Sequence, residues 1–68
     1  MYEKYLKILK EKNLKITSQR LEILKYLDEN RYHQSVDEIY NVLKEQNPSL
    51  SKTTVYNTLN TFLDKGIV

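Results

Sequence analysis

The 68-residue sequence contains no cysteine, and it has only one glycine and one proline. Without cysteine, neither a disulfide framework nor a thiolate metal site can form within these residues, and a cytoplasmic protein is the expectation. No apolar run is long enough for a transmembrane helix, and the lysine-rich N-terminus does not have the layout of a signal peptide. Because glycine and proline are so scarce, few turns are expected and helix should dominate.

The sequence also lacks the residue combinations that enzymes use. It has no cysteine nucleophile, no glycine-rich phosphate loop and no histidine paired with a carboxylate at a suitable spacing. Asp37 and Glu38 are adjacent acids, but helix capping and the helix dipole explain them. We therefore expect a protein that is not an enzyme.

Charge is unevenly distributed along the chain, although the net charge is only +2. Residues 1–20 carry six basic groups against two acids, residues 21–50 carry three against six, and residues 51–68 carry two against one. Basic ends and an acidic middle could present one face to a polyanion. On charge alone, an ordinary solvated surface remains the favoured interpretation.

Apolar residues recur at helical spacing in four segments, which predicts an all-α fold class. Capping chemistry sets their limits: Thr17 and Ser51 suit N-cap positions, Ser35 with Glu38 forms a capping box, and Gly66 stops the last helix. Ile67 and Val68, which follow that glycine, resemble the first residues of a strand. The predicted helices cover residues 1–13, 17–30, 35–47 and 51–65, and the apolar stripe of the last is Val55, Leu59, Phe62 and Leu63.

Only a short turn separates the third and fourth segments, because Pro48 disfavours helical geometry at Asn47. Two helices joined in this way form a helix-turn-helix or an αα-hairpin. The outer face of the fourth segment favours DNA recognition, since threonine and asparagine are poor helix formers and no carboxylate appears before Asp64. A helical protein–protein interaction module is the alternative. The outward residues are Ser51, Lys52, Thr53, Thr54, Tyr56, Asn57, Asn60 and Thr61.

Four pieces of the sequence, in this order and spacing, resemble the N-terminal domain of the ferric uptake regulator (Fur) family of metal-dependent repressors. They are LKITSQR from Leu14, HQSVDEIY from His33, SKTTVYNTL from Ser51 and KGIV from Lys65. The resemblance implies a winged helix-turn-helix with an extra N-terminal helix. It also implies that the fourth helix is the recognition helix and enters the major groove of double-stranded DNA, at an A/T-rich palindromic operator.

The same resemblance implies roles for individual residues. Lys15 would reach an adjacent minor groove, Tyr56 and Asn57 would lie near bases, and Asn57 favours the peroxide-responsive branch of the family. Phosphates would be held by Thr17, Arg20 and the start of the fourth helix. Together with Asn60 from the polar outer face, the full set of predicted DNA-binding residues is Lys15, Thr17, Arg20, Ser51, Lys52, Thr53, Thr54, Tyr56, Asn57 and Asn60.

His33 is the only histidine. Chemistry alone favours a loop histidine that donates to a backbone carbonyl, because one imidazole is not a metal site. The resemblance implies instead that His33 is one ligand of a regulatory metal site completed by residues outside this sequence. Iron or manganese at that site, and a structural zinc, are expected only in the full-length protein.

The domain organisation is also an expectation from the resemblance. Family members are longer and dimerise through a C-terminal domain, which these residues do not contain. Residues 1–68 should therefore be one winged-helix DNA-binding domain that ends before the wing hairpin. We expect it to be a monomer alone, a homodimer in the full-length protein, and without a membrane partner.

Overall fold

A computed structural model describes residues 2–30 and 35–67. The elements in chain order are α1 (Glu3–Glu11), α2 (Ser18–Glu29), α3 (Val36–Leu43) and α4 (Lys52–Asp64). Within these two ranges every regular element is a helix, which confirms the all-α prediction there. The strand expected at the C-terminal end is not formed at Ile67, and Val68 lies outside the described residues.

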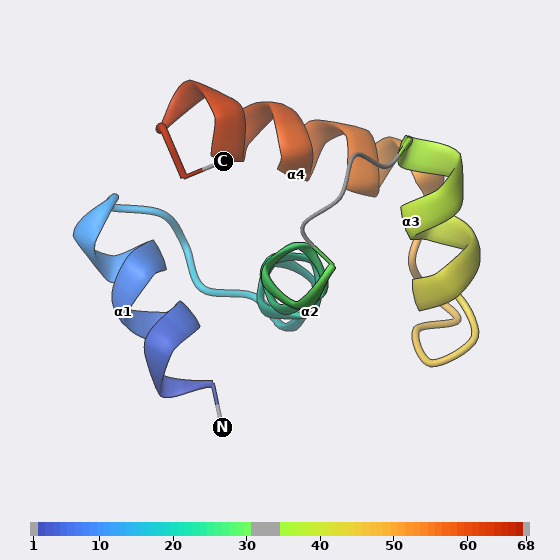
Figure 1. The fold of residues 1–68 in the computed structure, drawn as a ribbon, viewed down its shortest axis with the longest axis horizontal. Helices are drawn as coiled ribbons and strands as arrows, with labels where there is room; N and C mark the ends of the chain where they lie inside the picture. The colour runs from blue at the N-terminus through green and yellow to red at the C-terminus, as the bar shows by residue number, and fades with distance from the viewer. Residues whose placement is uncertain (1, 31–34, 68) are drawn as a thin grey trace.

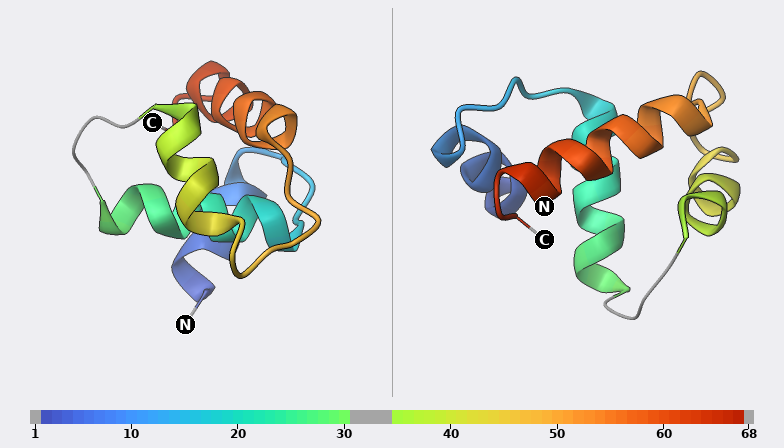
Figure 2. Two further views of the ribbon diagram at one scale, coloured as in Figure 1. Left: turned by 90° about the vertical axis from the view of Figure 1, so that its right-hand side faces the viewer. Right: turned by 90° about the horizontal axis from the view of Figure 1, so that it is seen from above.

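Apolar side chains from all four helices and from the turn before α4 form one core. Helix α2 lies at its centre, with α1 and α3 on either side and α4 across it (Figure 1). Views at right angles show α4 passing over the N-terminal half of α2 (Figure 2). Helix α1 is thus part of the domain rather than an appendage. The buried core residues are Tyr5, Leu9, Ile23, Leu24, Ile39, Leu43, Leu50, Val55 and Phe62.

Helices α2, α3 and α4 begin where their capping residues predict. The hydroxyls of Thr17 and Ser51 each accept a hydrogen bond from the backbone N–H three residues later, at 3.1 Å. At α3 the capping box is complete: Ser35 Oγ accepts from the Glu38 N–H at 3.2 Å, and Glu38 Oε1 accepts from the Ser35 N–H at 3.0 Å. These bonds satisfy N–H groups that a helix start would otherwise leave without a partner.

The capping box gives a first testable prediction. Replacing Ser35 with alanine removes the hydroxyl acceptor while the carboxylate of Glu38 remains, so Ser35→Ala should lower the free energy of unfolding by about 1 kcal/mol. Urea denaturation followed by circular dichroism measures this change. Ser49→Ala is the matched control, because Ser49 is also exposed but lies in the turn before α4. Equal losses in the two variants would contradict a stabilising role for the cap.

Helices α1 and α4 end in the same way. Beyond α4, the N–H of Gly66 donates to Leu63 at 3.1 Å and that of Ile67 to Phe62 at 2.9 Å, with Gly66 at φ +72°. This pair of bonds is a Schellman motif, which needs a left-handed residue just past the helix. Asn13, at φ 58°, fills that position after α1, so this helix ends at Glu11, two residues before the predicted limit.

Helix α3 also ends earlier than predicted, at Leu43 rather than Asn47. Single turns continue the chain to Asn47, whose side-chain amide donates to the Leu43 carbonyl at 3.1 Å. The N–H of Leu50 then donates to the Asn47 carbonyl at 2.9 Å, which closes a turn with Pro48 at its second position, where the fixed φ of proline fits. Buried Leu50 anchors this turn in the core and so sets the path between α3 and α4.

Polar contacts fasten α1 to α2. The phenol of Tyr2 donates to Glu22 at 2.7 Å, and the phenol of Tyr5 and the ammonium of Lys4 donate to Asp28 at 2.8 and 3.1 Å. The hydrogen bond to Glu22 raises the pKa of Tyr2 above its usual value, because the carboxylate favours the protonated phenol. These contacts tie the helix before Lys15 to the helix after it.

Candidate nucleic-acid interface

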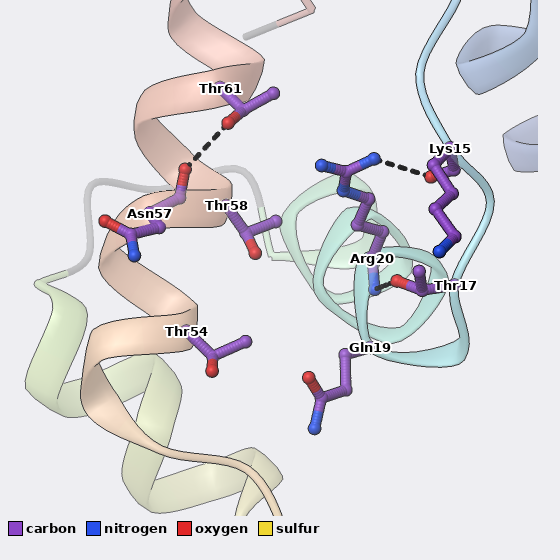
Figure 3. Close-up of a pocket in the computed structure, with 8 residues that line it drawn as sticks. All are labelled: Lys15, Thr17, Gln19, Arg20, Thr54, Asn57, Thr58 and Thr61. Carbon is purple, nitrogen blue, oxygen red and sulfur yellow. Dashed lines mark hydrogen bonds between the residues drawn. The ribbon is translucent and has the colours of Figure 1, made fainter.

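A groove of about 250 Å³ separates α4 from the start of α2 and the loop before it (Figure 3). Its side chains are all polar, two are cationic, and none of the described residues that line it is acidic. The N-terminus of α2 opens on the same groove, and its dipole adds partial positive charge. The surface therefore suits an anionic ligand. The lining residues are Lys15, Thr17, Gln19, Arg20, Thr54, Asn57, Thr58 and Thr61.

Hydrogen bonds order the wall formed by the loop and α2. The guanidinium of Arg20 donates to the Lys15 carbonyl at 2.6 Å, and the backbone N–H of Arg20 donates to the Thr17 hydroxyl at 3.1 Å. Figure 3 shows both bonds on the side of the groove opposite α4. Arg20 thus fixes the backbone that carries Lys15, and a capping hydroxyl that accepts one bond still has a proton to donate to a phosphate.

Residues of α4 at a spacing of three and four form the opposite wall: Thr54, Asn57, Thr58 and Thr61. Thr58 is buried and closes the floor of the groove, whereas the side chain of Asn57 is exposed. The Thr61 hydroxyl donates to the Asn57 carbonyl at 2.9 Å, so its polar group is turned back onto the helix. On this wall, Asn57 carries the side-chain amide that a base edge could meet.

Five of the ten residues predicted to bind DNA therefore line one groove: Lys15, Thr17, Arg20, Thr54 and Asn57. The other five do not line it, and all are exposed on α4 or at its cap: Ser51, Lys52, Thr53, Tyr56 and Asn60. The side chain of Tyr56 is 57% exposed, as expected for a residue turned away from the core. Lys52 is engaged elsewhere, because its ammonium lies 3.0 Å from a carboxylate oxygen of Asp37 on α3.

Three groove residues are not among the ten predicted to bind DNA: Gln19, Thr58 and Thr61, of which Thr61 belongs to the predicted outer face of the fourth segment. Gln19 is half-buried in the first turn of α2, two residues after the Thr17 cap, and its place at this helix start is the sequence signal that could have identified it. Thr58 lies three residues after Val55 and four before Phe62, both fully buried, so helical spacing places it at the edge of the core. A threonine there supplies a hydroxyl where the core meets the groove.

The metal prediction rests on His33, which lies outside the described residues. In residues 2–30 and 35–67 no three histidine, aspartate or glutamate side chains are grouped so as to hold a metal ion. Those same stretches contain no helix of the length and apolar character that crossing a membrane requires.

Curated relatives match most of this chain. It is 43% identical over 63 residues to the peroxide operon regulator of Bacillus subtilis (strain 168), a match that covers 93% of this chain and 43% of that protein. It is 43% identical over 60 residues to the peroxide-responsive repressor PerR of Staphylococcus aureus (strain Mu50), which covers 88% of this chain and 40% of the relative. The chain thus spans less than half the length of these relatives, whose names describe regulators rather than enzymes.

Solved structures show the same likeness. The structure titled "Structure of GAS PerR-Zn-Zn" superposes with a TM-score of 0.84 at 40% identity, covering 96% of this chain and 41% of that one. A structure of PerR from Streptococcus pyogenes, described as a basis for peroxide sensing and gene regulation, gives the same TM-score and identity and is covered to 44%. The model of the ferric uptake regulator family matches residues 11–68. With most of its length matched by that family model and by these relatives, the chain belongs to the ferric uptake regulator family.

Proposed function

We propose that residues 1–68 are the sequence-specific DNA-binding domain of a metal-dependent, peroxide-responsive transcriptional repressor. The observation that carries this proposal is the groove between α4 and the start of α2, which is polar, cationic and free of acids among its described residues. Phosphate recognition needs such a surface, because the DNA backbone supplies most of the electrostatic affinity. Helix α4 is the recognition helix of this proposal.

Each part of the face has a different task. The major groove of DNA accepts an α-helix, so α4 enters it with Asn57 toward an adenine edge and Tyr56 toward a thymine methyl. Lys15, on the ordered loop before α2, enters a neighbouring A/T-rich minor groove, whose negative potential attracts cations. The hydroxyls of Thr17, Ser51, Thr53 and Thr54, the guanidinium of Arg20 and the amide of Asn60 position the domain on phosphates.

The rest of the proposal extends to the full-length protein. The relatives named above are peroxide regulators, and Asn57 favours the same branch of the family. We infer a cytoplasmic homodimer on a palindromic operator, with a wing hairpin following Gly66. His33 would be one ligand of a regulatory iron or manganese site whose other ligands lie outside this chain, and a structural zinc would likewise need residues outside it.

Salt dependence tests the proposal. We expect affinity for double-stranded DNA to fall linearly on a log–log plot against salt concentration, because each neutralised phosphate releases counterions. Lys15→Ala should weaken binding to operator and scrambled DNA and reduce the slope by about one, with an additional loss on the A/T-rich operator, whose minor groove Lys15 enters. Fluorescence anisotropy with a selected A/T-rich operator measures both quantities.

Lys7→Ala is the control for this experiment, since Lys7 is an exposed lysine on α1 that does not line the groove. It should leave the slope unchanged. Binding that does not respond to salt would contradict the proposal and favour the helical protein-interaction module instead.

A further inference from the structure

An ion pair joins α3 to the start of the proposed recognition helix. Lys52 is the first residue of α4, and its ammonium lies 3.0 Å from Oδ1 of Asp37, in the first turn of α3. The same ammonium lies 5.9 Å from the centre of the Tyr40 ring. Lys52 is thereby directed toward α3 and is absent from the residues that line the groove.

The helix dipoles explain why this pair forms. A cation at the N-terminus of α4 meets the positive end of the dipole, which is unfavourable, whereas a carboxylate in the first turn of α3 is favoured. Asp37 therefore offers Lys52 a compensating charge, and the ring of Tyr40 adds a cation–π contact. Asp37 is attached to α3 by a short side chain, so the flexible side chain of Lys52 is the one that moves.

The pair has a consequence for DNA binding because both groups are open to solvent. The side chains of Lys52 and Asp37 are 59% and 69% exposed, so a DNA phosphate can reach the ammonium. To bind the ammonium, the phosphate must either displace the Asp37 carboxylate or bind beside it, where the two negative charges repel each other. Either event makes the contact of Lys52 with DNA weaker than that of an unpaired lysine.

We propose that Asp37 is a positioning residue of the DNA-binding face, which competes with DNA phosphates for Lys52 and so lowers affinity for any DNA. This inference rests on the proposed function, since it assumes that α4 approaches DNA. Asp37 acts on a charge–charge contact and not on base edges. It should therefore set the affinity and the salt dependence while leaving the preference for operator over scrambled DNA unchanged.

A double-mutant cycle tests the competition. Asp37→Asn should raise the affinity for operator and scrambled DNA by the same factor, about two- to fivefold at low salt, the range of an exposed ion pair. It should also steepen the salt slope by up to about one, as Lys52 gains a phosphate. Lys52→Gln should cost more affinity in the Asp37→Asn background than in the unaltered chain.

Glu29→Gln is the matched control, because it removes the same charge from the last residue of α2, at the end away from the groove. An equal gain in affinity from Glu29→Gln would overturn the inference, since only net charge would then matter. Equal costs of Lys52→Gln in the two backgrounds would overturn it as well. If the protein binds operator DNA but the effects of Asp37→Asn and Lys52→Gln are independent, this inference alone is wrong. If no variant binds DNA at low salt, the proposed function is wrong as well.

Discussion

Phe62→Ala should lower the free energy of unfolding by about 3–5 kcal/mol, the usual cost of removing a buried aromatic ring. Phe62 is fully buried in the core between α4 and the other helices. Roughly 0.05–0.15 kcal/mol per residue is typical of folded proteins, so a chain of this length has about 3–10 kcal/mol in total. The substitution should therefore remove a large part of the stability.

Leu63→Ala is the matched control, one residue further along the same helix. The side chain of Leu63 is 61% exposed, so its loss should change stability by no more than about 0.5 kcal/mol. Guanidinium denaturation of both variants, followed by circular dichroism, gives the comparison. If Leu63→Ala costs as much stability as Phe62→Ala, α4 does not turn Phe62 into the core and Leu63 toward solvent.

Local chemistry explains which parts of the fold were predictable from sequence. The starts of α2, α3 and α4 follow from hydroxyl side chains that accept from N–H groups three residues away, an interaction contained within one turn. The end of α4 was equally predictable, because glycine is the usual residue at a left-handed position. The end of α1 was missed because asparagine fills that position less often than glycine does.

Packing between helices explains what the sequence did not reveal. Leu63 was assigned to the apolar stripe of the fourth helix but is exposed, while Thr58 is buried. The spacing of apolar residues defines only a broad face of a helix. The helices that pack against that face decide which of its edges is buried. Leu50 is part of the core, but the sequence pattern does not predict this. A single apolar residue in a turn belongs to no repeating apolar spacing that could mark it as buried.

The same division holds for the candidate site. Poor helix formers and missing acids on the fourth segment identified the α4 wall of the groove, including Thr54 and Asn57. The contact of Arg20 with the Lys15 carbonyl and the pairing of Lys52 with Asp37 depend on how the chain folds back on itself. The sequence pattern therefore indicates which residue types form the proposed DNA-binding face, whereas the ion pairs and hydrogen bonds of that face become visible only in the folded structure.

Tyr56→Ala and Asn57→Ala should each lower operator affinity by about 1–3 kcal/mol and leave affinity for scrambled DNA nearly unchanged. Neither side chain is charged, and both are exposed on α4. A tyrosine ring can contact a thymine methyl, and an asparagine amide can pair with an adenine edge, so under the proposed function each would read sequence without adding to the phosphate contacts. The salt slope should accordingly stay the same in both variants.

Asn41→Ala provides the comparison, because Asn41 is an exposed asparagine on α3 and does not line the groove. Its affinities for operator and scrambled DNA should both match those of the unaltered chain. Titrations at several salt concentrations separate the two kinds of contact. On a plot of log affinity for the operator against log salt concentration, loss of a base contact lowers the line without changing its slope, whereas loss of a phosphate contact also changes the slope. Equal losses on operator and scrambled DNA for Tyr56→Ala and Asn57→Ala would mean that α4 does not read sequence, and the assignment of α4 as recognition helix would fall.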